Sequence, residues 1–230
     1  MACLTRPAYY RGFHLRDVAR PEYRHLFYLL FWLLQPLTFF GIGYHSLASF
    51  RLVHVPLDDV IPFCAPFVVP YVVWYPFVGL SLLYTVLYDV DAFRWQMRFF
   101  LVTYTVAYVA FFFWPTGQDM RPALGEGGGP FVWLLRLIYA ADPPTNCCPS
   151  LHVVGSIGAA LGLSDSRRFG RPLWRAGIWA MAALISVSTV FVKQHSAADV
   201  GGALVLCAAG YLLIYQLGRR LSARKAAKEG

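Results

Sequence analysis

The chain has 230 residues, of which 58% are hydrophobic and only 14% are charged, whereas soluble domains carry about 25% charged residues. This composition excludes an ordinary soluble globule, and an aromatic content of 17% excludes a disordered tail. The formal net charge of +8 is therefore interpreted through membrane topology rather than through nucleic-acid binding.

Two basic segments flank a long apolar region. Residues 1–25 carry five arginines among Tyr and Phe, which is typical of either an interfacial helix against anionic headgroups or a solvated leader. No cleavage site follows a short apolar core, so we expect the first apolar run to remain in the mature chain. Residues 219–230 form a basic cytoplasmic tail that is expected to contact lipid headgroups rather than nucleic acid.

Between these segments, six apolar stretches approach the roughly 20 residues that a helix needs to cross a bilayer. They lie at 26–46, 60–87, 99–114, 150–164, 176–192 and 199–218. Four prolines in the second stretch favour a kinked or partly re-entrant segment: Pro62, Pro66, Pro70 and Pro76. The sequence predicts an all-α integral membrane protein, a six-transmembrane-helix bundle with its catalytic domain over 26–218.

The basic residues are distributed unevenly between the loops. Only Arg51, Arg121, Arg136 and Lys193 fall on one side of the expected membrane, and the other 16 of the 20 Lys and Arg residues fall on the opposite side. Basic loops of membrane proteins stay on the cytoplasmic side. We therefore expect both termini to be cytoplasmic and the loops 47–59, 115–149 and 193–198 to face the periplasm, lumen or cell exterior.

The segment around His152 has the pattern of a helix start. Pro149 ends an extended loop, Ser150 is a favoured N-cap, and a stretch of small apolar residues follows. Free backbone N–H groups and the positive end of the helix dipole bind anions, so a phosphate would fit beside His152. The alternative is that Ser150 only caps a helix and that His152 lies at the membrane interface.

His195 and Asp199 stand four residues apart at the start of the last apolar stretch. On a helix this spacing places both on one face, where the carboxylate can orient the imidazole. The other ring nitrogen could then attack phosphorus or move a proton; a structural pair that closes the helix end is the alternative. Arg121 could grip phosphate oxygens bidentately, although a lone arginine commonly contacts only water or headgroups.

Together, these three segments resemble the signature of the type-2 phosphatidic acid phosphatase superfamily, which includes lipid phosphatases, vanadium haloperoxidases, and sphingomyelin and inositol phosphorylceramide synthases. The family pattern is Lys-x6-Arg-Pro, then Pro-Ser-Gly-His, then Ser-Arg-x5-His-x3-Asp, and its membrane members have six spans with the site facing away from the cytosol. The matching residues are Arg121 and Pro122, then Pro149, Ser150 and His152, then Ser188, His195 and Asp199.

Three positions depart from that pattern. Trp114 stands in place of the first-motif lysine, Leu151 in place of the glycine, and Thr189 in place of the third-motif arginine. We interpret Lys193 as a replacement for one of the missing cations. Pro-Ser-Leu-His is closer to the inositol phosphorylceramide synthase branch, so hydrolysis and transfer both stay open.

The resemblance implies that His195 is a nucleophile that forms a phosphohistidine, that Asp199 orients it and that His152 protonates the leaving alkoxide. Arg121, Ser150 and Lys193 would bind the substrate phosphate. Because these groups would stabilise the transferring phosphoryl group, a task otherwise given to magnesium, no metal or cofactor is expected.

We therefore expect a metal-independent lipid-phosphate phosphatase whose substrate is a phospholipid, a sphingolipid or a polyprenyl phosphate, and which binds membrane lipids but no nucleic acid. A lipid phosphotransferase of the inositol phosphorylceramide or sphingomyelin synthase type is the first alternative. A noncatalytic lipid-binding or transport protein is the second.

The remaining features are interpreted as packing. The five cysteines form no Cys-x-x-Cys pair and predict neither a zinc site nor a disulfide framework; Cys147 and Cys148 are expected to be inert or interfacial, with a redox role as the alternative. Gly158 and Gly162 indicate a small-residue helix interface. The other histidines are expected at interfaces: His14, His25, His45 and His54.

Overall fold

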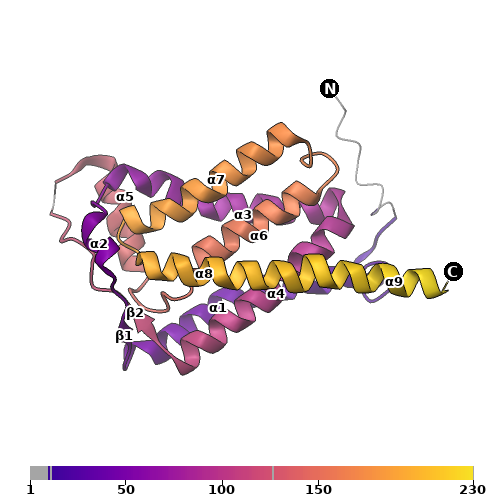
Figure 1. The fold of residues 1–230 in the computed structure, drawn as a ribbon, viewed down its shortest axis with the longest axis horizontal. Helices are drawn as coiled ribbons and strands as arrows, with labels where there is room; N and C mark the ends of the chain where they lie inside the picture. The colour runs from indigo at the N-terminus through magenta and orange to yellow at the C-terminus, as the bar shows by residue number, and fades with distance from the viewer. Residues whose placement is uncertain (1–9, 11, 126, 230) are drawn as a thin grey trace.

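The computed structural model describes residues 10, 12–125 and 127–229 and shows a bundle of long helices that run side by side (Figure 1). The helices are α1 (Tyr28–Leu47), α2 (Pro56–Val60), α3 (Val68–Tyr88), α4 (Val90–Phe113), α5 (Gly129–Ala141), α6 (Leu151–Asp165), α7 (Pro172–Phe191), α8 (Ala197–Gly210) and α9 (Arg219–Glu229). A π-helical stretch, Tyr211–Gly218, joins α8 to α9, so the end of the chain forms one continuous rod.

Within the described residues, five helices are long and apolar enough to cross a membrane. They occupy Arg24–Tyr44, Ala65–Tyr88, Val90–Phe113, Pro172–Phe191 and Ala197–Arg224. The chain is therefore a multi-pass helical membrane protein. The second of these helices begins at Ala65 rather than at the expected 60: Pro62 precedes it, Pro66 lies in its first, 3-10 turn, and Pro70 and Pro76 lie inside α3.

Helix α6, which covers the predicted fourth stretch, has 15 residues and is shorter than these five. It lies at the centre of the bundle and packs against α3, α4, α7 and α8. Neighbouring side chains press against its glycines: a Cβ added at Gly158 would come within 2.3 Å of Phe100, and one at Gly162 within 2.3 Å of Gln96. The predicted small-residue interface is confirmed.

Replacing Gly158 by alanine is expected to destabilise the bundle by about 1–3 kcal/mol, since the added methyl group would overpack against the buried Phe100 ring. Gly177→Ala on α7 is the matched control, because a Cβ there meets nothing within 4 Å. Thermal unfolding in detergent measures both variants. Equal melting temperatures for Gly158→Ala and the wild type would contradict the close packing of Phe100 on α6.

Two parts of the fold differ from the sequence-based expectation. The long loop expected at 115–149 contains α5, which begins after Gly128 in the left-handed conformation and has Pro130 in its first turn. Two short parallel strands, β1 (Arg51–Leu52) and β2 (Thr116–Gly117), also tie the loops together, with Arg51 opposite Thr116. Each strand is two residues long, too short for an alternating hydrophobic pattern to reveal it.

The described part of the N-terminal segment has short 3-10 turns at Leu15–Asp17 and Arg24–Phe27 in place of a continuous interfacial helix; residues 1–9 and 11 lie outside the described residues. His25 is buried, and its ring bonds to the Tyr10 hydroxyl at 2.6 Å and to the Glu22 carbonyl at 3.0 Å. His25 thus has partners that its sequence neighbourhood did not indicate, and its expected place at the membrane interface stays a prediction.

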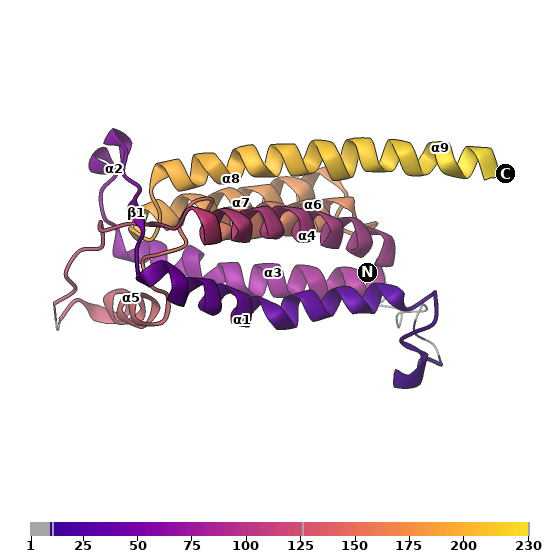
Figure 2. The ribbon, with the colours of Figure 1, turned by 90° about the horizontal axis from the view of Figure 1, so that it is seen from below.

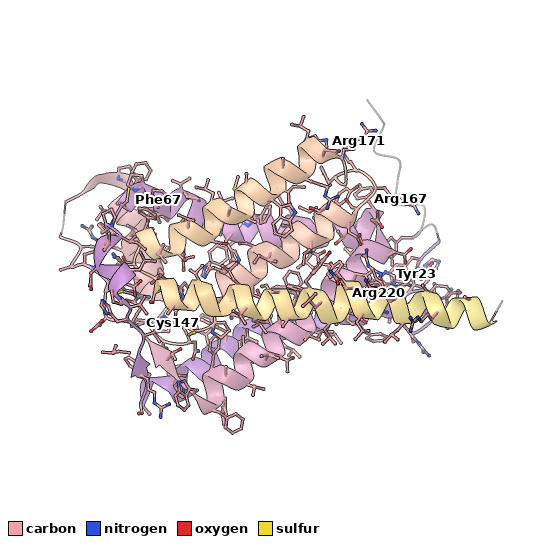
Figure 3. All side chains as sticks on the ribbon, in the orientation of Figure 1. Tyr23, Phe67, Cys147, Arg167, Arg171 and Arg220 are labelled. Atoms are coloured by element: carbon pink, nitrogen blue, oxygen red, sulfur yellow. The ribbon has the colours of Figure 1, made fainter. Side chains whose placement is uncertain are left out.

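The two ends of the bundle differ in character. Arg167, Arg171 and Arg220 lie toward the end that also holds Tyr23, and Cys147 and Phe67 lie toward the other (Figure 3). Figure 2 shows α1 along one side of the bundle and the α8–α9 rod along the opposite side. The loop connections that carry the sequence motifs thus gather at the end away from these arginines.

Candidate active site

The start of α6 is where the sequence predicts it. Ser150 is the N-cap and is fully buried, but its hydroxyl makes no hydrogen bond with any described residue and does not cap the helix. Its backbone N–H donates instead to the Asp199 carbonyl at 3.1 Å, which joins the start of α6 to the start of α8. His152 lies in the first turn of α6, buried, and its Nε2 has no partner within the described part of the chain.

His195 lies on the loop before α8, and not on the helix face that the four-residue spacing predicted. The reason is that Ser196 is the N-cap of α8: Ala198 N donates to its Oγ, and Ser196 N donates to the Asp199 carboxylate at 2.9 Å. The expected contact forms all the same, since 3.2 Å separates His195 Nδ1 from Asp199 Oδ2. A carboxylate in this position favours the proton on Nδ1 and leaves the Nε2 lone pair free.

The two histidines come together from distant parts of the chain. Their ring centroids are 5.7 Å apart, and the planes are inclined by 64°. Both rings line a cavity of about 270 Å³, and Arg121 lines the same cavity. The convergence of the three motif segments, expected from the resemblance, is thus present in the fold.

Arg121 is held in place by the end of α5. Its guanidinium donates to the carbonyls of Tyr139 at 3.1 Å and Asp142 at 2.7 Å, and it lies 4.6 Å from the centre of the Tyr139 ring. Its Nε is buried with no hydrogen bond to any described residue. Arginine has five N–H donors, so donors remain for a ligand. Burial lowers the pKa of Arg121 while Asp142 opposes the shift, and a guanidinium stays charged in either case.

Asp142 is a cavity residue that the sequence motifs did not indicate. Its carboxylate accepts hydrogen bonds from the Tyr71 hydroxyl at 3.2 Å and from Gln194 Nε2 at 3.5 Å. Burial raises the pKa of Asp142, although His195 and Arg121 counteract that effect. A carboxyl group that takes up a proton more readily repels an anionic ligand less.

Lys193 does not lie where a phosphate ligand would be expected. Its Nζ donates to the carbonyls of Asp58 at 2.8 Å and Ile61 at 2.6 Å, and it is not among the described residues that line the cavity. The Lys193 side chain therefore joins the 193–198 loop to α2 and to the residue that follows it. The backbone of Lys193 is left-handed, with φ of 55°, because it ends α7: Lys193 N donates to the Val190 carbonyl and Gln194 N to the Thr189 carbonyl.

Asp58, on α2, makes further hydrogen bonds to the same loop and to the start of α8. Its carboxylate accepts hydrogen bonds from the Ser196 hydroxyl and from Ala197 N at 2.7 Å. Burial alone would raise the pKa of Asp58, but these donors and the N–H of Val55 hold it below the ordinary value. The ionised form therefore stabilises the loop of His195 at neutral pH, and this contribution is lost as the pH falls through the lowered pKa.

Aromatic rings form the wall around His152. The ring centroids of Tyr71 and Trp74 lie 4.4 Å and 4.6 Å from that of His152. Gly155 makes room for this packing, because a Cβ there would come within 2.6 Å of Trp74. The imidazole is therefore fixed by contacts that no motif in the sequence encodes.

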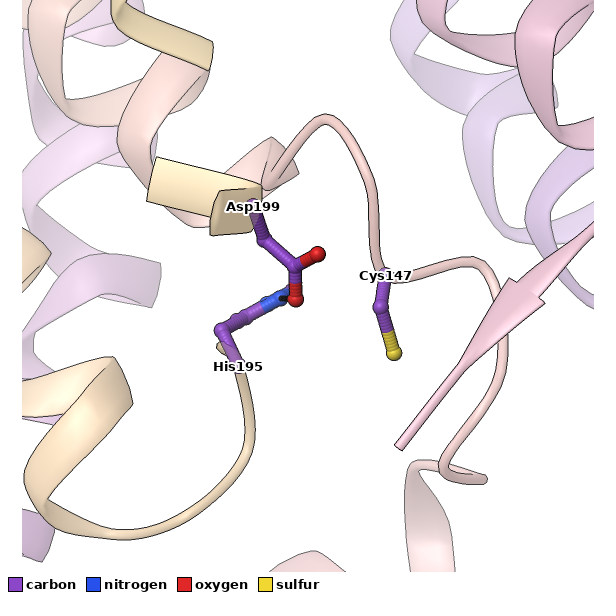
Figure 4. Close-up of side chains that lie close together, drawn as sticks. All are labelled: Cys147, His195 and Asp199. Carbon is purple, nitrogen blue, oxygen red and sulfur yellow. Dashed lines mark hydrogen bonds and ion pairs between the residues drawn. The ribbon is translucent and has the colours of Figure 1, made fainter. Parts of the chain in front are cut away.

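Cys147 lies beside the histidine and aspartate pair, on the loop that leads into α6 (Figure 4). One ligand atom from each of Cys147, His195 and Asp199 falls within 4.8 Å of the other two, and all three residues are buried. Burial, followed by the charges of Asp199 and Asp142, raises the pKa of the Cys147 thiol well above its usual range. That shift agrees with the expected inert thiol, because the thiolate is the reactive form.

Comparison with protein-family models, with curated proteins and with solved structures finds no match for this chain. The fold defines a multi-pass helical membrane protein, and the lining of its cavity includes two imidazoles, the Arg121 guanidinium and the Asp142 carboxylate.

Proposed function

We propose that this protein is a membrane lipid-phosphate phosphatase that hydrolyses a phosphate ester through a phosphohistidine. The observation that carries the proposal is the 5.7 Å separation of the His152 and His195 rings, which line one cavity with Arg121. At that separation the two rings are in edge-to-face contact, so a nucleophile on one ring and an acid on the other could act on the same phosphoryl group in the cavity.

In this mechanism His195 Nε2 attacks phosphorus while Asp199 holds the proton on Nδ1 and stabilises the charge that develops on the ring. His152 donates a proton to the leaving alkoxide, and in the second step it removes a proton from the water that attacks the phosphohistidine. Arg121 and the free N–H groups at the start of α6 bind the phosphoryl oxygens. The product is inorganic phosphate, and the enzyme returns to its starting state.

The shape of the cavity supports a lipid ester as substrate. Its walls beyond the polar end are apolar and aromatic, and they come largely from α1 and α4: Trp32, Pro36, Phe39, Phe40, Tyr104 and Tyr108. The hydroxyl of Tyr108 bonds to Gln35 across these two helices. A molecule with a phosphate at one end and a hydrocarbon chain at the other would match this division.

The proposed orientation places the cavity on the noncytoplasmic side, with both termini in the cytoplasm. It is supported by the arginines at the opposite end of the bundle (Figure 3) and by the preference of basic segments for the cytoplasmic side. We count α6 as the sixth span. Its 15 residues extend about 22 Å, but a helix enclosed by protein need not match the full hydrocarbon thickness.

Transfer to a second alcohol is the alternative fate of the same phosphohistidine. Among the described residues, Arg121 is the one Lys or Arg side chain that lines the cavity, whereas the family pattern contains one lysine and two arginines.

The purified chain in vesicles distinguishes the two reactions when a lipid phosphate is supplied with and without ceramide, diacylglycerol or a polyol. We expect free phosphate to appear at the same rate in every case, whereas release that requires an alcohol, with a phosphorylated alcohol as product, would establish transfer.

A further inference from the structure

We propose that Cys147, His195 and Asp199 form an inhibitory binding site for a thiophilic divalent cation such as Zn²⁺. The regulatory role rests on the proposed function, because it assigns one residue, His195, to both the reaction and the metal. Binding of the cation itself can be tested without any turnover.

The first observation is the set of donor atoms. A thiol, an imidazole and a carboxylate lie within 4.8 Å of one another, and the three residues are buried. Sulfur, nitrogen and oxygen donors of this kind are the usual ligands of Zn²⁺, with bonds of about 2.0–2.3 Å. Alkaline-earth cations prefer oxygen ligands alone, so the thiol favours zinc over magnesium or calcium.

The second observation is the spacing of the histidine and aspartate. His195 Nδ1 and Asp199 Oδ2 are 3.2 Å apart. Two ligands of a tetrahedral ion with bonds of about 2.0 Å are separated by about 3.3 Å, so this pair needs little movement to share a cation. The sulfur must approach by about 1 Å for its bond to reach the usual length, which is within the range of a side-chain rotation.

The third observation is an acceptor that the fold leaves unused. Asp199 Oδ1 is buried and has no hydrogen bond that meets ordinary geometric limits among the described residues; the nearby Cys148 thiol is a weak donor. A buried carboxylate oxygen without a strong partner carries a desolvation cost. Coordination of a cation would remove that cost.

Access and inhibition both follow from the position of the cluster. Cys147 and His195 line the cavity, so a cation can reach them by the route that the substrate uses, and water or a substrate oxygen can fill the fourth ligand position. Binding replaces the thiol proton of Cys147, which passes to solvent, and the Nδ1 proton of His195, in exchange for which Nε2 takes up a proton from solvent. It also withdraws His195 and Asp199 from their roles in phosphoryl transfer, and the reaction stops.

The binding test uses Co²⁺ as a spectroscopic probe on the full chain in detergent, after treatment with a chelator. A cysteine ligand is expected to give a thiolate-to-metal charge-transfer band that saturates at one ion per chain in the wild type and disappears in Cys147→Ser. Cys64→Ser, outside the cavity lining, is the matched control and should keep the band. A band of equal strength in Cys147→Ser, or no band in the wild type, would overturn the site.

The regulatory test compares turnover of a lipid phosphate with and without free Zn²⁺. We expect Zn²⁺ to inhibit the wild type, EDTA to restore its rate, and the half-inhibitory concentration to rise at least 10-fold in Cys147→Ser, with Cys147→Ala as a second variant if the first is unstable. Activation by Zn²⁺, or equal sensitivity of these variants and the wild type, would disprove inhibition through this site. A protein that binds Co²⁺ through Cys147 but turns over no lipid phosphate would keep the metal site and refute the proposed function.

Discussion

Replacing His195 by alanine is expected to abolish lipid-phosphate turnover, with kcat lower by about 10³-fold or more, as for other enzymes that lose their nucleophile. The reason is that the Nε2 atom would form the bond to phosphorus, while Asp199 holds the opposite ring nitrogen at 3.2 Å. Phosphate release by the purified variant in vesicles measures the effect.

His54→Ala is the control for this experiment. His54 forms an exposed hydrogen bond with Asp59 and is not among the described cavity residues, so its loss should change turnover less than about threefold. A His195→Ala protein that is folded by thermal unfolding and turns over substrate at the wild-type rate would refute the catalytic assignment. The noncatalytic lipid-binding alternative predicts that no variant changes turnover, because the wild type would have none.

Replacing His152 by glutamine is expected to lower turnover of an alkyl phosphate by about 10²–10⁴-fold, the usual contribution of a general acid. The first step, measured as the initial burst of nitrophenol, should slow far less with a nitrophenyl phosphate, whose leaving group departs without a proton. With that substrate the second step lacks its base, so phosphohistidine should accumulate. Rapid quenching followed by detection of acid-labile phosphate on the protein measures this intermediate.

An equal slowing of the first step with both substrates would show that His152 does not protonate the leaving group. In that case the contacts of its ring with Tyr71 and Trp74 would point to a structural role. Tyr75→Phe is a useful companion, because Tyr75 also lines the cavity but its ring centroid lies farther from His152, at 6.5 Å. It should affect both substrates alike.

The sequence alone could predict the membrane fold and the meeting of His152 with His195. Hydrophobic runs of near-bilayer length identify helices well, and the N-cap position of Ser150 was predictable from its type and from the proline before it. The His195–Asp199 contact was predictable from spacing, although the capping role of Ser196 moved His195 off the helix.

Other parts of the site could not be predicted in this way. Asp142 and Lys193 are positioned by hydrogen bonds between segments far apart in sequence, and a spacing rule carries no information on such contacts. Helix α5 did leave a signal, since an apolar run lies between Gly129-Pro130 and Asp142-Pro143. Cys147 had none, because its neighbours in the cluster are 48 and 52 positions away along the chain.

Helix α1 provides one wall of the cavity, yet it packs mainly against α4 and most of its surface is exposed. In a bilayer that exposed surface is covered by acyl chains. Helix α1 therefore lies between one side of the cavity and the surrounding leaflet, and its displacement would let a lipid substrate of the proposed reaction enter without leaving the hydrocarbon. The turnover rate of such an enzyme would depend on bilayer fluidity as well as on its chemistry.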